Sequence, residues 1–301
     1  MHKISIFFIL ISLFGYSQRS SYSPYSYFGV GETNFTATVE NQMMGGNTAY
    51  YDSVHQNMNN AASLAKLKFV NYSVGVDLKN TSYLSDSENE KSTAAAINYI
   101  SVAIPTNLLS FSFGIKPKTS VGYLLENDDK SRTPSELNRF TGSGGISNAF
   151  VSIGFELFKN WGLGVSSSYA FGNLNHYHIK ILEDVELYTR VASESSVSGL
   201  DYNFSSVYQK TFNEKITLYT SIVYQPEANY KSRNNQAIQT INPNGNFGGD
   251  SEEIDLSAIG LKNTNIKIPS SLSFGLGFGQ DKKWFLGLNY LRTDEGGYKN
   301  Q

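Results

Sequence analysis

The feature that most constrains the fold is an alternation of large apolar and very small residues in the stretch WGLGVSSSYAFG, residues 161–172. Its odd positions carry Trp161, Leu163, Val165, Ser167, Tyr169 and Phe171. Its even positions carry only Gly, Ser and Ala. A period of two residues is that of a β-strand with two different faces. A soluble β-sandwich would place long polar side chains on the second face. A face of tiny residues instead favours a strand of a membrane β-barrel, with its apolar side toward lipid.

The same alternation recurs along the chain in segments close to the length of a membrane strand, which is about 9–11 residues. The expected strands are residues 69–78, 111–115, 149–157, 202–212, 216–225, 270–279 and 284–290. Tight turns such as FKNWG (158–162) and FNEKI (212–216) alternate with long polar connections at 126–145 and 241–260. Short periplasmic turns and longer outer loops are typical of outer-membrane barrels. We therefore expect about ten to twelve strands in an up-and-down antiparallel order.

The composition agrees with this fold class. The 301 residues include 20 Tyr, 19 Phe and 26 Gly, only 17% are charged, and the mean hydropathy is −0.30. Soluble proteins carry about 25% charged residues. No apolar run reaches the about 18 residues of a membrane-spanning helix. With a net charge of −2 and no evident basic face, the chain is expected to have no nucleic acid partner. The absence of cysteine excludes disulfides, thiolate catalysis and cysteine-based metal sites.

The N-terminus, MHKISIFFILISLFGYSQ, has the pattern of a secretory signal peptide, because Lys3 precedes a short apolar core. We expect residues 1–17 to be this signal. Residues 18–66 lack strand periodicity and are expected to form an N-terminal hatch, or plug, segment. Residues 67–301 are expected to form the barrel. Export and a barrel together predict the outer membrane of a Gram-negative cell.

Local motifs resemble those of the FadL-type outer-membrane transport family, which includes long-chain fatty-acid transporters and PorV-like barrels of Bacteroidetes. The stretch QMMGGNTAYYDSVHQNMNNAASLA (42–65) is similar to the family's N-terminal hatch, and IPSSLSFGLGFGQDKKWFLGLNY (268–290) is similar to its late strands. The hatch or gate candidates that follow from the resemblance are Gly45, Gly46, Asp52, Asn60 and Ala62. Independently of the resemblance, Asn59 or Asn60 is expected to cap a short helix over residues 61–67.

The resemblance implies a transmembrane barrel that passes small hydrophobic molecules such as long-chain fatty acids. The partners would be outer-membrane lipid and these hydrophobic molecules. One alternative is a PorV-like protein that docks or shuttles secreted proteins, in contact with secretion-system proteins. Another is an exported soluble β-sandwich adhesin. Because the last residues, LRTDEGGYKNQ, have the composition of a loop, we also expect a C-terminally truncated barrel, open between 69–78 and 284–290.

No pattern in the sequence predicts a chemical reaction. His176 and His178 could face one side of a strand, but no third metal ligand is evident. The sequence has no Gly-x-Ser-x-Gly elbow, and its glycine-rich runs do not begin a helix in a βαβ unit. We therefore expect no enzyme activity, no catalytic residue, no bound metal and no cofactor.

Overall fold

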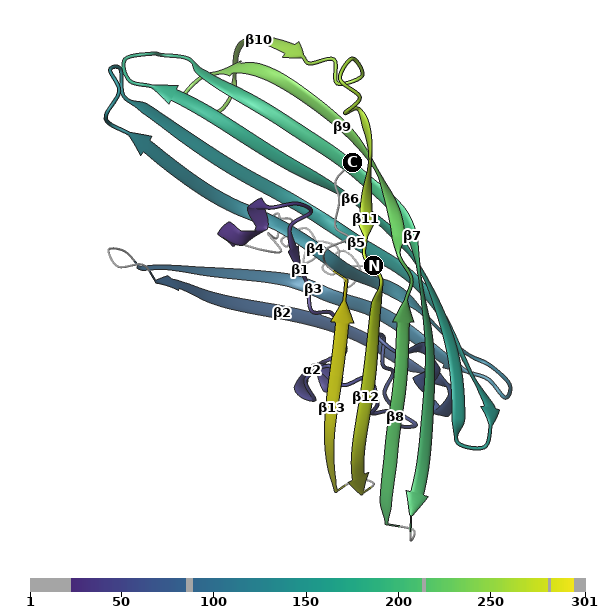
Figure 1. The fold of residues 1–301 in the computed structure, drawn as a ribbon. Helices are drawn as coiled ribbons and strands as arrows, with labels where there is room; N and C mark the ends of the chain where they lie inside the picture. Colours follow the sequence, from purple (N-terminus) through teal and green to yellow (C-terminus); the bar gives the residue numbers. More distant parts are fainter. Residues whose placement is uncertain (1–22, 85–88, 213–214, 281–282, 295–301) are drawn as a thin grey trace, which may run out of the picture.

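The computed structural model describes residues 23–84, 89–212, 215–280 and 283–294. The expected signal peptide lies outside the described residues. The described part consists of one large antiparallel β-sheet with a few short helices near its N-terminal end (Figure 1). The expectation of an all-β, antiparallel fold is confirmed. Within the described ranges, no helix has both the length and the apolar character needed to cross a bilayer.

Short elements come first and long strands follow. The short elements are the 3₁₀ helix η1 (Pro24–Tyr27), strand β1 (Glu32–Thr33), helix α2 (Val39–Met43) and the 3₁₀ helix η2 (Ala61–Lys66). The next strands are β2 (Asn71–Leu84), β3 (Asn89–Pro105), β4 (Ser110–Asp129), β5 (Glu136–Phe158), β6 (Trp161–Leu182) and β7 (Tyr188–Phe212). The last strands are β8 (Ile216–Gln225), β9 (Ala228–Ile241), β10 (Phe247–Glu253), β11 (Asn263–Ile268), β12 (Ser271–Gln280) and β13 (Trp284–Thr293).

The long strands form an up-and-down meander. Strands β2 to β7 pair in sequence order, and β7 then pairs with β9 along one half and with β8 along the other. Strands β8 and β9 are two parts of one long strand that is interrupted at Pro226, and β11 and β12 are two parts of the next, interrupted at Pro269. Proline has no N–H to donate to a ladder, so it lies where pairing is interrupted. Strand β13 ends the sheet beside β12.

The sheet curls into a half-barrel (Figure 1). Among the described residues, β2 pairs only with β3 and β13 only with β12, so no ladder joins β2 to β13. In the described part of the chain, a closed barrel with a plug inside it is therefore not observed, and the opening that we expected between residues 69–78 and 284–290 lies between β2 and β13. The alternation of residues defines the two faces of a strand, but closure depends on strand tilt and register, which the alternation does not contain.

Several strands are longer than the sequence pattern predicted. Strand β7 has 25 residues, more than twice the about 9–11 residues that cross a bilayer. Most of the expected loop at 126–145 is strand, because β4 continues to Asp129 and β5 begins at Glu136. The polar residues there resemble a loop in composition, yet cross-strand hydrogen bonds hold them in the sheet. The tight turn at FKNWG is confirmed, since Phe158 pairs with Trp161.

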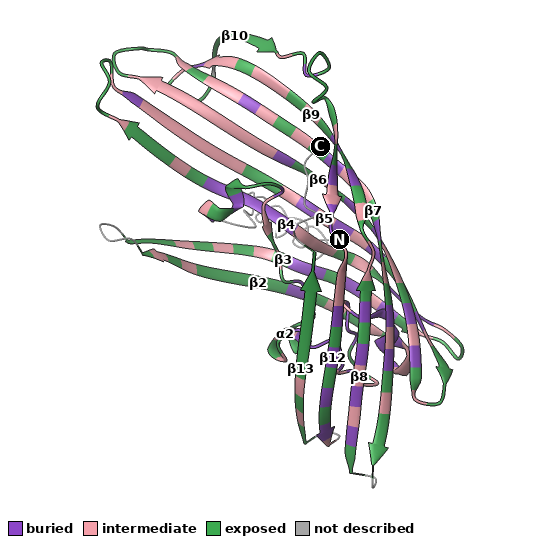
Figure 2. Ribbon diagram, viewed as in Figure 1, coloured by how far each residue is buried: buried purple, intermediate pink, exposed green. Residues whose placement is uncertain are grey.

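The two faces of the sheet differ as predicted. In β6, Trp161, Val165 and Tyr169 are exposed on the convex face, whereas Gly164 and Ala170 are buried on the concave face. Figure 2 shows the same alternation of buried and exposed residues along β8 and β12. We call the exposed apolar residues of the convex face the apolar belt; they include Val151, Ile153, Trp161, Val165, Tyr169, Phe171, Leu200, Tyr202, Phe204, Phe212, Ile222, Tyr224, Phe274, Leu276, Phe278, Trp284, Leu286, Leu288 and Tyr290.

Candidate functional site: the N-terminal segment on the concave face

Residues 23–68, here called the N-terminal segment, run across the concave face of the sheet. Near η1, the N–H of Ser23 donates to the carbonyl of Gly122 in β4 at 2.7 Å, and β1 pairs with the same strand. Helix η2 packs against β5, β6 and β7. Figure 1 shows α2 and its neighbouring loops within the lower part of the curl. The segment therefore contacts the sheet along much of its height.

Two of the candidate residues lie together where η2 meets the sheet. Asn60 is completely buried; its Oδ1 accepts from the Ala62 N–H at 3.1 Å and its Nδ2 donates to the Thr48 carbonyl at 2.7 Å. The Ala62 N–H also donates to Oγ of Ser205 in β7 at 2.8 Å. The predicted helix start is thus confirmed, with Asn60 as the N-cap.

The contact with η2 explains the tiny residues of the concave face. A Cβ added at Gly164 would lie 2.2 Å from the Ala62 nitrogen, and one at Gly154 would lie 2.4 Å from the Ala61 carbonyl oxygen. Both distances are far below van der Waals contact. Only glycine at these positions allows the backbone of η2 to approach the strands so closely.

Other side chains of the segment connect it to distant strands. Thr48 Oγ1 donates to Oδ1 of Asn289 in β13 at 2.6 Å and lies 2.9 Å from Oγ of Ser221 in β8. Gln56 Oε1 accepts from Oγ of Ser112 in β4 at 2.8 Å. The segment therefore links strands near opposite ends of the curled sheet. Sequence reasoning missed these residues because a single Thr or Gln in an aperiodic stretch carries no distinguishing pattern.

Asn47 organises the interior of the segment and was also missed. Its carbonyl accepts from Nδ2 of Asn41 at 2.7 Å and of Asn57 at 3.1 Å, and its Oδ1 accepts from the N–H groups of Ala49 and Tyr50 at 2.8 and 3.1 Å. These bonds satisfy polar groups of buried loops, which would otherwise destabilise the fold. The one available signal was the density of asparagine, whose short side chain bonds readily to loop backbone.

The remaining glycine candidates shape a turn after α2. Gly45 and Gly46 have φ values of +68° and +71°, which glycine adopts without strain. A Cβ added at Gly46 would lie 2.2 Å from the ring of Phe35. A Cβ added at Gly45 would have no atom within 4 Å. Their role in the described structure is conformational.

Asp52, the last candidate, closes a small loop of its own. Its Oδ1 accepts from the N–H groups of Val54 and His55 at 2.8 and 2.6 Å, and its Oδ2 lies 2.7 Å from Nδ1 of His55. Burial acts to raise the pKa of this carboxyl, but the hydrogen bonds from His55 and Val54 outweigh burial and hold the pKa below the ordinary value of 3.8. Asp52 thus stabilises the loop and does not join the contact made by Asn60 and Ala62.

A charged cluster ties three strands across the concave face. Nζ of Lys118 in β4 lies 2.8 Å from Oδ2 of Asp201 in β7 and donates to the hydroxyl of Tyr230 in β9 at 2.5 Å. The Tyr230 hydroxyl donates to the same carboxylate. The Asp201 side chain is only 7% exposed, so the pair is largely removed from water. The cluster borders a cavity of about 360 Å³ between the segment and the sheet, which both Lys118 and Asp201 line.

The two histidines considered for a metal have other partners. Nδ1 of His176 is 2.7 Å from the hydroxyl of Tyr123, and Nε2 of His178 is 2.7 Å from Oδ1 of Asn138. The His178 ring also stacks on Phe140 with ring centroids 4.4 Å apart. In the part of the chain that the structure describes, no group of three or more His, Cys, Asp or Glu side chains is arranged to hold a metal.

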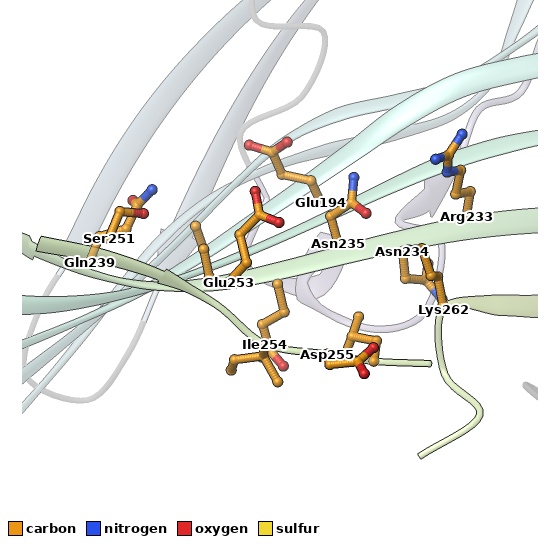
Figure 3. A pocket seen from close by; sticks show the side chains of 14 residues that line it. Glu194, Arg233, Asn234, Asn235, Gln239, Ser251, Glu253, Ile254, Asp255 and Lys262 are labelled. Atoms are coloured by element: carbon orange, nitrogen blue, oxygen red, sulfur yellow. The ribbon is translucent and has the colours of Figure 1, made fainter. Parts of the chain in front are cut away.

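A polar groove of about 630 Å³ lies beside β9, where β10 and the following connection pass over it. Figure 3 shows Arg233 and Lys262 toward one end of this groove, Gln239 and Ser251 toward the other, and the acidic residues Glu194, Glu253 and Asp255 between them. All five charged side chains are exposed. No ion pair joins any of them among the described residues.

Comparison with known proteins corrects the expected family. A protein-family model described as BamG matches residues 1–301. No curated protein and no solved structure matches the chain. The match overturns the resemblance to the FadL-type family, so the expected passage of fatty acids and other hydrophobic molecules, the PorV-like alternative and the secretion-system partners are wrong.

The short motifs behind that resemblance have local causes. Gly45 and Gly46 meet the demands of a turn and Asn60 caps a helix, and such needs arise in unrelated proteins. The match to BamG, in contrast, covers the whole chain. The chain therefore belongs to the BamG family, which is associated with the outer membrane.

Proposed function

We propose that this protein takes part in the assembly of outer-membrane proteins, as a membrane-embedded, non-enzymatic partner of the β-barrel assembly (BAM) complex. The observation that carries the proposal is the match to BamG over residues 1–301. The fold also supports a position within the membrane.

The apolar belt supports insertion into a bilayer. In β6 the belt runs from Trp161 to Phe171, which agrees with the about 9–11 residues of a membrane strand. The next outward positions, Asn173 and Asn175, are polar. Soluble monomers rarely expose a contiguous apolar surface of such extent. Lipid is therefore the natural cover for the belt, with Trp161 at one of its borders.

The central strands extend past the belt. On the convex face of β7, the apolar positions run from Leu200 to Phe212. Before Leu200, the residues of the same face are polar: Ser198, Ser196 and Glu194. This part of the sheet projects from the membrane on the side of the long connections, which is the outer side in proteins of this architecture. Its polar surface is available to other proteins of the assembly machinery.

In this proposal the N-terminal segment stabilises the curled sheet by linking its strands. Residues 1–17 would direct export, residues 18–66 would form the hatch-like segment, and residues 67–301 would form the membrane sheet. The buried polar groups of Thr48, Gln56 and Asn60 bind strands and backbone. Their engagement in structural hydrogen bonds supports a role without a chemical step.

Depletion of the protein from its own bacterium tests the function. Newly made outer-membrane barrels are pulse-labelled, and their conversion to the folded form, which migrates differently on a gel unless heated, is followed over time. We expect slower conversion on depletion and recovery on re-expression. Unchanged conversion, with unchanged amounts of barrel proteins in the membrane, would overturn the proposal.

A further inference from the structure

The convex face of β9 and β11 is basic. Lys231 and Arg233 alternate in β9 and are exposed on this face. In β11, Asn265 lies opposite Lys231 and Asn263 lies opposite Arg233, so the cross-strand neighbours of both charged residues are polar and uncharged. Lys262, in the connection before β11, is also exposed and lies with Arg233 in the groove of Figure 3. We call Lys231, Arg233 and Lys262 the rim patch.

The rim patch lies directly beside the apolar belt. Lys231 pairs with Ser198 of β7, and Leu200, the next outward residue of β7, belongs to the belt. Two residues of a strand span about 7 Å. A lysine or arginine side chain can cover this distance with its apolar stem and place its charge at the level of lipid headgroups.

The cationic side chains of the rim patch form no direct ion pair in the described part of the chain. Among the described residues, no carboxylate lies within ion-pairing distance of Lys231, Arg233 or Lys262. The neighbouring Lys267 does have a partner, since its Nζ lies 2.7 Å from Oε2 of Glu227. Three acidic residues, Glu194, Glu253 and Asp255, line the same groove, and among the described residues none of them forms an ion pair with the rim patch.

We propose that the rim patch binds the phosphate groups of anionic membrane lipids at the border of the apolar belt. Guanidinium and ammonium groups are the usual partners of phosphate, and arginine can bind it in a bidentate manner. Basic clusters next to a membrane segment recruit anionic lipids. The proposal rests on the membrane placement proposed above and adds a lipid class and a position to it.

The chain contains no cysteine, which permits a single labelling site. The probe site is Asn229→Cys, the outward position of β9 next to Lys231; the control site is Val76→Cys, an exposed position of β2 at the far end of the sheet. Each labelled protein is reconstituted in phosphatidylcholine vesicles with a minor fraction of acceptor-labelled phosphatidylglycerol. We expect energy transfer to show about twofold or greater enrichment of the anionic lipid at Asn229→Cys relative to Val76→Cys. Acceptor-labelled phosphatidylcholine should show no enrichment.

A matched pair of variants separates local binding from overall charge. Lys231→Gln, Arg233→Gln and Lys262→Gln together should abolish the enrichment. Lys159→Gln, Lys210→Gln and Lys215→Gln change the net charge equally at the short-turn end and should preserve it. Equal transfer at both probe sites, or enrichment that survives in the rim-patch variant, would overturn the rim patch while the membrane placement stands. Failure of the wild-type protein to float with the vesicles would overturn the membrane placement, and the rim patch with it.

Discussion

At the scale of single residues, glycine and asparagine determine how the N-terminal segment lies on the sheet. Because Gly164 has no side chain, η2 can approach the backbone of β6 closely. Asn60 forms hydrogen bonds with both the first turn of η2 and the Thr48 carbonyl. The sequence predicted Asn59 or Asn60 as the cap and showed that the even positions of β6 carry only very small residues. It could not pair the two features, because contact between segments distant in sequence follows only from the folded topology.

We predict that Gly164→Val lowers the free energy of unfolding by about 1–3 kcal/mol, because the new side chain would overlap the backbone at Ala62. Denaturant unfolding in detergent micelles would measure the loss, and proteolysis within the segment would locate it. Gly249→Ala is the control, since no atom lies within 4 Å of its added Cβ. Equal losses in both variants would contradict the proposed close contact.

The loop closed by Asp52 should depend on pH. Because its pKa lies below 3.8 in the folded protein, the ionised form is favoured by folding. The loop should therefore be fully stable above about pH 4 and lose stability as the pH falls through the lowered pKa. Amide chemical shifts of Val54 and His55 would report the transition, which Asp52→Asn should abolish. A midpoint at or above 3.8 in the wild-type protein would refute the stated direction.

At the scale of elements, strand faces were predictable and strand ends were not. The alternation in β6 and β12 and the tight turn before Trp161 followed from residue pattern, since period and turn chemistry are local. Strands β3, β9, β10 and β11 and the polar halves of β4 to β7 were missed. In β9 and the polar halves, the side chains face water or a partly polar interior on both sides, so the sequence lacks the apolar alternation that reveals a strand. Strand β3 does carry this alternation, in Ile100, Val102 and Ile104, and was overlooked.

The apolar belt leads to a depth-dependent prediction. Arg in place of Val165, near the middle of the belt in β6, should cost about 2–4 kcal/mol of stability in a bilayer, whereas Arg in place of Phe171, at its border, should cost about 0–1 kcal/mol. Equilibrium unfolding from lipid vesicles would measure both values. Similar costs at the two positions would indicate that lipid does not cover the belt.

The cluster of Lys118, Asp201 and Tyr230 should stabilise the pairing of distant strands. Removing one charge of a buried pair costs more than removing both, because the other charge is left uncompensated. We expect Asp201→Ala to destabilise the protein by about 3 kcal/mol and the double variant Lys118→Met, Asp201→Ala to recover at least half of this loss. Denaturant unfolding of the single and double variants tests this. No recovery in the double variant would show that the ion pair is not the cause.

At the scale of the whole molecule, a curled sheet has an apolar convex face and a concave face on which the chain's own N-terminal segment lies. The sequence predicted an association with the outer membrane, which the family match supports, because amphipathic strands and scarce charge are typical of that environment. It did not predict the biological role. Transport and assembly proteins share the same strand pattern, so role cannot be inferred from that pattern alone.

Reconstituted assembly tests the central claim most directly. Vesicles are prepared with the organism's purified BAM complex, either with this protein or without it, and the folding of an added barrel substrate is followed by its heat-dependent migration on a gel. The account predicts faster folding or a higher folded yield with the wild-type protein, and a smaller gain with Gly164→Val. Identical time courses with and without the protein would contradict a role in outer-membrane protein assembly.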